Sequence, residues 1–213
     1  MRTPVLWLPE PPDGTKVCGG FDGSENDDFT AIKLETFDGL IFTPRYGPDR
    51  LPTIWQPSLW QGRIPRAQVR VAWAELAQRF DFTGEARVYC DPGFHDESSW
   101  ETDIETWATD LPDVSFVQWP TNSIRRMYPA LKRFEADLAA GKVRHDGCPL
   151  TTAAMRNARK VPKRADTYVL GKPEQTQKID AAVTSVLAHE AAADARASGW
   201  GVKDETDTRV FCF

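Results

Sequence analysis

The sequence contains no apolar run that approaches the roughly 20 residues needed to cross a membrane, so we expect no membrane partner. The apolar stretch near the N-terminus is short and interrupted by prolines, which does not fit a signal peptide. The four cysteines lie far apart with no Cys-x-x-Cys pair, and the three histidines do not cluster. These absences argue against a zinc ribbon or other structural metal and favour a reducing cytosol.

Acidic residues outnumber basic ones overall, but the basic residues are concentrated in one segment. The net charge is −5, which taken alone argues against nucleic-acid binding. Residues 121–178 nevertheless hold thirteen Lys and Arg against five Asp and Glu, which leaves thirteen against twenty-six elsewhere. This asymmetry indicates a basic face on an acidic body and a polyanionic partner. The alternative is a solvated face that happens to be charged.

The apolar pattern predicts strands and helices in a defined order. Strands are expected at 16–22, 29–36, 40–46, 85–91 and 114–119, with Asp38-Gly39 as a hairpin turn. Helices are expected at 65–80, 97–109, 123–140 and 176–197, the last with Thr176 as its N-cap. Residues 47–65 look like an ordered loop, and 145–172 like a basic segment with a short strand at 167–170.

This order favours one α/β domain. Three leading strands with a hairpin, followed by alternating helices and strands, suit a mixed five-stranded sheet flanked by helices on both faces. We expect a single domain over residues 1–213, with a core at about 16–197 and a tail at 198–213. In such sheets, functional residues lie at strand ends near the point where the strand order reverses.

Two aspartates follow predicted strands at such ends. Asp22 comes after Val17–Phe21 and before Gly23-Ser24, and Asp91 comes after a second apolar run and before Pro92-Gly93. Either one alone is explained by turn formation, because an Asp side chain bonds nearby backbone amides. If the two strands are parallel neighbours, the two carboxylates lie side by side.

A third aspartate strengthens the case for chemistry. Asp180 lies early in the last predicted helix, near its apolar stripe. The helix dipole favours an acid there, which is the simpler explanation. A carboxylate beside an apolar face is costly, however, unless it is paired or binds a cation. Three gathered acids repel one another, and hard Mg²⁺ or Mn²⁺ relieves that repulsion through oxygen ligation.

Four segments together resemble a known family. "GFDGSENDDFTAI", "VYCDP", "GKVRHDGCPL" and "QKIDAAVTSVL" are similar, in order, to the nuclease domain of the large terminase subunit of tailed bacteriophages. The resemblance implies a ribonuclease-H-like fold and cleavage of concatemeric viral DNA by two divalent metal ions, Mg²⁺ or Mn²⁺. It assigns the metal-binding and catalytic positions to Asp22, Asp91 and Asp180.

Further positions match the family pattern more loosely. Asp28 fits the D-x-T element after the first strand, although turn formation is its simpler role. Lys178 matches a basic residue before the third acid, where it would contact a phosphate or lie near the metal site. The alternative is a solvated lysine in the first turn of the helix. Gln177 lies where some relatives place a histidine, and His145 fits a His-x-x-x-Pro element. The alternative for His145 is hydrogen bonding within its loop.

The resemblance implies that the basic segment binds DNA. Five residues before the last helix are candidates for binding double-stranded DNA through its phosphates: Arg156, Arg159, Lys160, Lys163 and Arg164. The implied protein partners are the small terminase subunit and the portal protein, in the cytoplasm of the infected bacterial host. The ATPase domain of the family is not expected within this chain, because the phosphate-binding G-x-x-x-x-G-K-[ST] motif is absent. We therefore expect a C-terminal fragment or a separately encoded part.

Two alternatives to a packaging endonuclease remain open. One is another ribonuclease-H-like phosphodiester enzyme, such as a Holliday-junction resolvase or a transposase core. The other is a catalytically silent module that binds DNA or docks to a motor.

Overall fold

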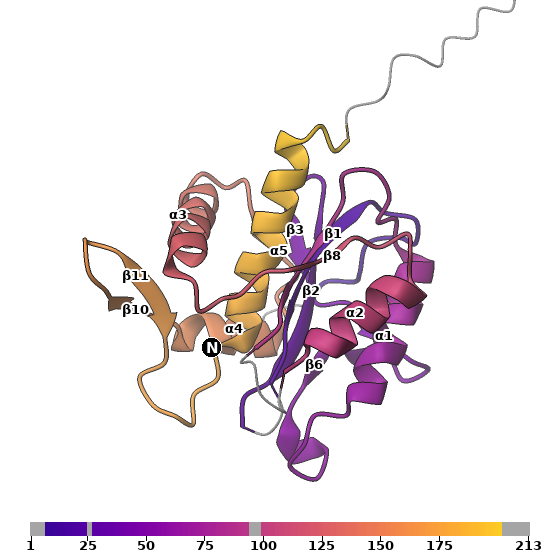
Figure 1. Ribbon diagram of the computed structural model, residues 1–213, viewed down its shortest axis with the longest axis horizontal. Coiled ribbons are helices and arrows are strands. Elements are labelled where there is room, and N and C mark those ends of the chain that lie inside the picture. Colours follow the sequence, from indigo (N-terminus) through magenta and orange to yellow (C-terminus); the bar gives the residue numbers. More distant parts are fainter. Residues whose placement is uncertain (1–6, 25–26, 94–98, 202–213) are drawn as a thin grey trace, which may run out of the picture.

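The computed structural model describes residues 7–24, 27–93 and 99–201, and its centre is a mixed β-sheet (Figure 1). The main sheet has the strand order β8-β7-β1-β2-β3-β9, and β6 pairs with β2. Its strands are β1 (Val17–Asp22), β2 (Thr30–Thr36), β3 (Leu40–Phe42), β6 (Ile54–Trp55), β7 (Val88–Asp91), β8 (Phe116–Gln118) and β9 (Arg144–His145). The α/β fold class is confirmed, and the two-residue strands β6 and β9 extend the five expected strands.

The first three strands form an antiparallel meander. β1 pairs with β2 from Val17↔Thr36 to Asp22↔Ala31, and β2 pairs with β3. The predicted turn at Asp38-Gly39 is present, and Gly39 has a φ of +84°. A side chain there would place its Cβ 2.2 Å from the carbonyl oxygen of Lys142, so this position requires glycine.

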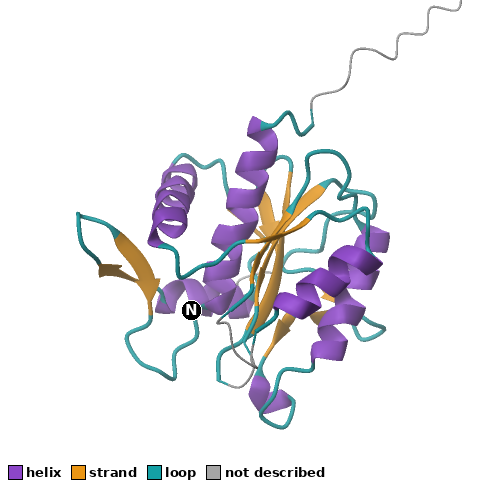
Figure 2. Ribbon diagram, viewed as in Figure 1, coloured by secondary structure: helices purple, strands orange, loops and turns teal. Residues whose placement is uncertain are grey.

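Helices cover both faces of the sheet (Figure 2). On one side lie α1 (Arg66–Arg79) and α2 (Glu101–Asp110), and on the other α3 (Ile124–Ala139), α4 (Pro149–Asn157) and α5 (Asp180–Ala197). The α1–α2 side is aromatic: the Phe21 ring meets Trp100 and Trp107 edge-on, with centroids 5.1 and 5.0 Å apart. Such pairs add to the stability that comes from burying apolar area.

Helix α5 lies against the centre of the sheet and is buried along most of its length. The close approach depends on Gly20 in β1. A Cβ at Gly20 would lie 2.4 Å from the Thr184 carbonyl oxygen and 2.6 Å from the Ala188 nitrogen. Glycine therefore lets the helix backbone rest directly on the strand, which fixes the first turn of α5 over the carboxyl end of β1.

Several elements differ from the sequence-based expectation. The last helix begins at Asp180, with Ile179 as its N-cap, so the assignment of Thr176 as N-cap was wrong. The basic segment contains α4 and a hairpin of β10 (Arg159–Pro162) and β11 (Tyr168–Gly171), of which only β11 was expected. The loop at 47–65 contains β5 (Leu51–Pro52), which pairs with β4 (Arg45–Tyr46), and the short 3₁₀ helix η1 (Pro57–Leu59). These short pieces carry too little periodicity to be detected.

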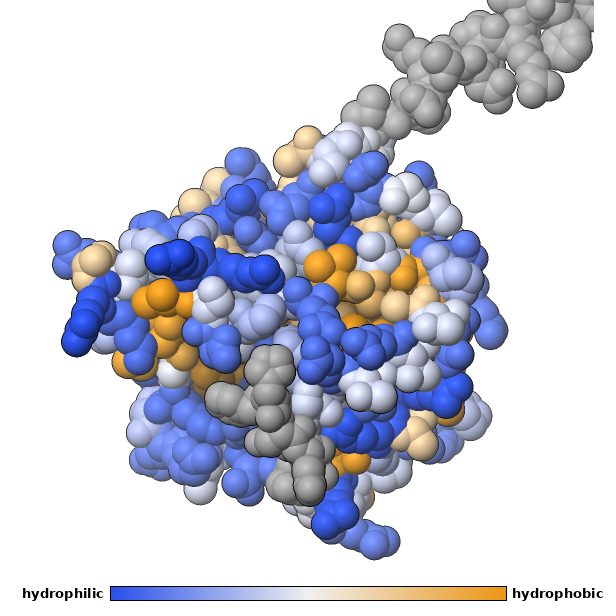
Figure 3. Space-filling model, viewed as in Figure 1, coloured by the Kyte–Doolittle hydropathy of each residue, from blue (hydrophilic) through white to orange (hydrophobic). Residues whose placement is uncertain are grey.

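Within the described residues, no helix has the length and apolar character needed to span a bilayer. Figure 3 shows one face of the molecule, on which hydrophilic residues predominate and apolar patches are interspersed.

Candidate active site

Asp22 and Asp91 end two neighbouring parallel strands. β1 and β7 pair from Gly19↔Val88 to Asp22↔Asp91, so the two aspartates are direct partners in the register. Both point to the face that α5 covers, since Gly20, two residues before Asp22, contacts that helix. Adjacent strands lie about 4.8 Å apart. The sequence-based expectation that these two acids lie side by side is therefore confirmed by the register.

Asp180 is the first residue of α5 and is only 9% exposed. Burial, together with the charge of Asp28, raises its pKa to about 6. Backbone N–H groups of Phe29 and of Asp180 itself oppose this increase. The Oδ2 atom of Asp180 is buried and has no hydrogen-bond partner among the residues that the structure describes. A desolvated carboxylate oxygen without a donor is an unfavourable arrangement that a bound cation would relieve.

The three acids share one electrostatic environment. Burial raises the pKa of Asp22 well above its ordinary value, and the nearby carboxylates of Asp91, Asp180 and Asp28 raise it further. Each of these acids therefore lies close enough to disfavour ionisation of Asp22. The structure thus brings together Asp22, Asp91 and Asp180, which the sequence places on three separate elements.

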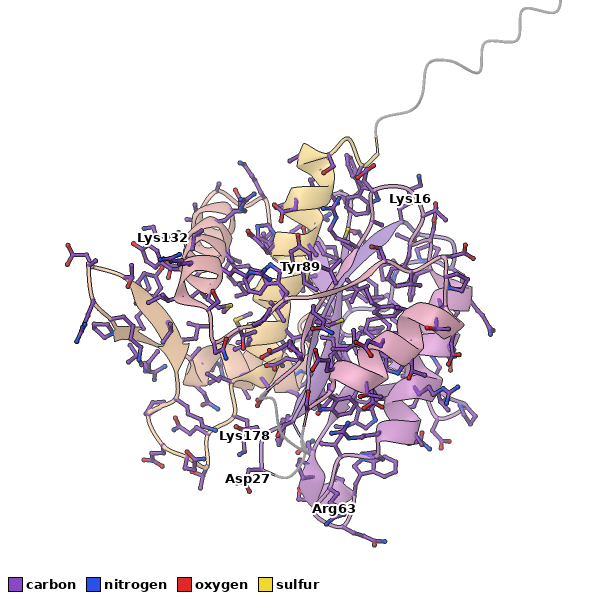
Figure 4. All side chains as sticks on the ribbon, in the orientation of Figure 1. Lys16, Asp27, Arg63, Tyr89, Lys132 and Lys178 are labelled. Carbon is purple, nitrogen blue, oxygen red and sulfur yellow. The ribbon has the colours of Figure 1, made fainter. Side chains whose placement is uncertain are left out.

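Asp28 lies next to this group but is neutralised by two lysines. Its Oδ1 accepts hydrogen bonds from Lys172 Nζ at 2.6 Å and from Lys178 Nζ at 2.8 Å. Burial alone would raise the pKa of Asp28, but the two ammonium groups outweigh burial and lower it. Asp28 is thus ionised and paired with both lysines. The ammonium group of Lys178 is therefore directed to Asp28 and not to bulk solvent. Figure 4 shows Lys178 close to Asp27, at the opposite end of the molecule from Lys16.

Asp91 is held in place by hydrogen bonds. Its Oδ2 accepts one from the Thr121 hydroxyl, and its Oδ1 accepts one from the Gly93 N–H at 3.2 Å. Thr121 was missed by sequence reasoning. Its position shortly after β8, the next parallel strand, is the signal that marks it, because the carboxyl ends of parallel strands meet at one edge. Lys172, which follows β11, was also missed, and no sequence pattern marks it as a site residue.

The oxygen atoms available at this site suit hard divalent cations as metal ligands. Aspartate oxygens suit Mg²⁺ and Mn²⁺. Within the described part of the chain, two buried acceptors near the start of α5, Gln177 Oε1 and Asp180 Oδ2, receive no hydrogen bond. In the described ranges, no three His, Cys, Asp or Glu side chains are grouped closely enough to form a ready ligand set.

His145 is not brought to the acids. It pairs in β9 with Ile41, whose register partner in β2 is Glu35, whereas Asp22 pairs with Ala31. Four residues along β2 correspond to about 13 Å at roughly 3.3 Å per residue. Nδ1 of His145 accepts a hydrogen bond from the Gly147 N–H at 3.1 Å, which is the loop role that was the alternative.

The basic candidates line a separate edge of the molecule. Arg156 ends α4, and Arg159 and Lys160 lie in β10 of the hairpin. Lys163 and Arg164 lie between β10 and β11, and all five side chains are exposed. Lys160 is partly engaged, because its Nζ lies 2.7 Å from Glu135 Oε1. The hairpin therefore presents cations whose charge is largely uncompensated.

Comparison with known proteins identifies relatives. Residues 89–195 match the family model "Terminase large subunit, endonuclease domain", a range that contains Asp91 and Asp180 but not Asp22. The chain is 28% identical over 193 residues to the Gene 13 protein of Mycobacterium phage D29, and 27% identical to its counterpart in phage L5. Each alignment covers 85% of this chain and 30% of the relative, so the chain spans about a third of these relatives.

Solved structures share the fold. The HK97 bacteriophage large terminase superposes with a TM-score of 0.63 at 21% identity, covering 89% of this chain and 41% of that one. The large terminase nuclease of thermophilic phage G20c with bound magnesium gives 0.61 at 15% identity, covering 87% and 92%. These matches agree with the expected ribonuclease-H-like architecture. Since the family model matches half of the sequence, this chain belongs to the family of terminase large subunit endonuclease domains.

Proposed function

We propose that this chain is a metal-dependent DNA endonuclease domain that cuts concatemeric viral DNA during genome packaging. The observation that carries the proposal is the meeting of Asp22, Asp91 and Asp180 at the carboxyl edge of the sheet, with the pKa of both Asp22 and Asp180 raised. Acids that lie together and have raised pKa values are typical of a functional site.

In this proposal the three aspartates hold two divalent ions, Mg²⁺ or Mn²⁺. Such ions activate water and stabilise the leaving oxygen of a phosphodiester. Related G20c nuclease structures are described with bound magnesium, cobalt and zinc, which supports the use of divalent metals. Thr121 and Gly93 would keep the Asp91 carboxylate oriented. Lys172 and Lys178 would limit the negative charge at the site by neutralising Asp28.

DNA would be held through its phosphates by the exposed cations of α4 and the β10–β11 hairpin. Contacts of this kind bind without regard to sequence and weaken with salt. By family membership, the small terminase subunit and the portal protein are proposed partners, in the cytoplasm of the host bacterium. Gln177 beside Asp180 would bond a water or a metal-bound group, since its Oε1 lacks a donor.

Incubation of supercoiled plasmid with the protein and Mn²⁺ or Mg²⁺ tests the proposal. Nicked and linear products are expected with either ion, and none when the ions are chelated. An intact plasmid under all metal conditions would instead support the silent DNA-binding module. A strong preference for four-way junctions over plain duplex would support the resolvase alternative.

A further inference from the structure

A cavity lies on the α5 side of the sheet, apart from the three site aspartates. It has a volume of about 300 Å³ and opens between α3, α4 and the β3–β9 edge. Its walls are mainly apolar: Ile41, Phe134, Leu138, Val143 and Met155. Leu138 and Met155 are also among the exposed large hydrophobic residues, at 41% and 36%. None of the three site aspartates is among the described residues that line it.

The floor of the cavity contains a buried lysine without a carboxylate partner. Lys33 in β2 is fully buried, and its Nζ donates hydrogen bonds to the hydroxyls of Thr43 and Thr151. Among the described residues it forms no ion pair, and burial lowers its pKa to about 8, although Cys148 and the carboxylate of Asp146 partly oppose this shift. An ammonium whose direct hydrogen-bond partners are two hydroxyls is an unfavourable buried group, and an anion in direct contact would stabilise it further.

Thr151 connects this lysine to the cavity. The Thr151 hydroxyl oxygen accepts a hydrogen bond from Lys33 Nζ, so the Thr151 hydroxyl hydrogen can donate a hydrogen bond to another group. One acceptor, Thr43 Oγ1, lies 3.3 Å away, and a ligand in the cavity would provide another. The hydroxyl is therefore a donor that an adjacent cation polarises, and such charge-assisted bonds are the stronger ones.

The rim adds further donors. Nδ1 of His145 accepts the Gly147 N–H, so in the neutral ring the proton is on Nε2, which can donate. Arg156 also lines the cavity. The one lining carboxylate, Asp146, already accepts hydrogen bonds from the Thr43 N–H, the Cys148 N–H and the Trp7 indole. The polar side chains around these apolar walls thus mainly offer donors and positive charge.

We propose that this cavity binds a small amphipathic anion, with its apolar body between α3 and α4 and its carboxylate directed to Thr151 and Lys33. The cavity volume of about 300 Å³ is at the low end for small-molecule sites, so the ligand must be small. The donor set determines the charge of the head group. The head-group site at Thr151 and Lys33 is separate from the three aspartates, and only Arg156 is shared with the proposed DNA-binding surface.

Three probes with the same six-carbon chain test the head group: hexanoate, hexanol and hexylamine. Binding is measured by calorimetry and by chemical-shift changes on the intact protein, in buffer without divalent metal. Hexanoate should bind about ten- to a hundredfold more tightly than hexanol, the effect of one or two charge-assisted hydrogen bonds. Hexylamine should bind more weakly still. Equal binding of all three, or no binding of hexanoate, would overturn the proposal.

Two variants locate the contact. Thr151→Val keeps the shape of the side chain but removes the hydroxyl, and should weaken hexanoate about tenfold while leaving hexanol unchanged. Lys33→Met should have the same selective effect. Thr109→Val, at an exposed position of α2, is the matched control and should change nothing. Unchanged hexanoate binding in Thr151→Val would contradict the assignment even if Lys33→Met failed to fold.

Discussion

Asp22 and Asp91 are register partners on adjacent parallel strands, so their carboxylates extend from the same edge of the sheet to the same face. Asp180 approaches this pair from the first turn of α5, and its charge contributes to the raised pKa of Asp22. Two strand ends and one helix start therefore supply the acids. None of the three depends on a long loop for its position.

Replacing any of these acids should abolish cleavage. We expect Asp22→Asn, Asp91→Asn and Asp180→Asn each to reduce the rate of plasmid nicking by at least about a hundredfold, the scale of losing one electrostatic contact to a transition state. Nicking is followed on gels in Mn²⁺, and circular dichroism verifies folding. Asp113→Asn, before β8 at the other edge of the sheet, is the control and should keep full activity. Full activity in one acid variant would remove that residue from the site.

The Asp180 charge should destabilise the metal-free protein at neutral pH. The folded pKa is about 6, against an ordinary value of 3.8. Between these values the folded state holds a proton that the unfolded state has lost, so stability falls as pH rises through this window. Asp180→Asn should therefore raise the free energy of unfolding by about 1–3 kcal/mol at pH 7.5. Near pH 3.5 the gain should disappear.

Urea titrations in a chelator at both pH values measure this difference. A variant that is less stable than wild type at pH 7.5 would show that the carboxylate is favourably paired. Added Mn²⁺ should reverse the order, since a ligand that binds only the folded state raises its stability. The melting temperature of wild type should rise with Mn²⁺ concentration, and that of Asp180→Asn should rise much less.

Gly20 should tolerate no side chain, unlike its neighbour Gly19. Gly20→Ala forces α5 away from β1 and should cost about 3 kcal/mol or more in unfolding free energy, the upper range of overpacking. It should also reduce nicking, because Asp180 moves with the helix. In Gly19→Ala, the added methyl meets only side-chain methyls of Leu34 and Val88 at 3.1 Å or more. Its cost should be below about 1.5 kcal/mol. Equal losses in the two variants would contradict this view of the interface.

The exposed cations of α4 and the hairpin should control the salt dependence of DNA binding. Combining Arg156→Ala, Lys163→Ala and Arg164→Ala should reduce the slope of log K against log salt by about 0.9 for each phosphate that is no longer neutralised. The slope of log K against log salt is measured by fluorescence anisotropy with two DNA duplexes of unrelated sequence. Lys16→Ala, just before β1 and far from Lys178 in Figure 4, should leave it unchanged. Identical slopes in both variants would place the DNA elsewhere.

Long periodic elements were predictable from the sequence. Strands β1 and β2 and helices α1 and α3 lie within a few residues of their expected bounds. In α3, burial of one face gives the apolar residues a helical period, whereas β1 and β2 are buried on both faces and are marked by short runs that end at turn residues. Helix α4 and strand β10 were missed, since short polar segments are fixed by tertiary contacts. The first turn of α5 was misplaced for a related reason. Residues 176–179 have a composition typical of helices. However, the Lys178 side chain donates a hydrogen bond to Asp28, and the Lys178 carbonyl accepts one from the Asn157 side chain.

The candidate site was predictable in its acids but not in its supporting contacts. Asp22 and Asp91 follow from strand ends, and Asp180 follows from an acid beside an apolar stripe. The pairing of Asp28 with Lys172 joins residues far apart in sequence, and no local pattern encodes it. The assignment of His145 could not be decided either, because its distance from Asp22 depends on the pairing of β9 with β3.

The direct packing of α5 on β1 also sets when the site can form during protein synthesis. Strand β1 leaves the ribosome well before the helix that covers its Gly20 and carries Asp180, because most of the described chain lies between them. Contacts this far apart in sequence form only after the intervening chain is available. A nascent chain therefore holds Asp22 and Asp91 without their third partner until α5 has been made, and under the proposed function DNA cleavage would become possible only then.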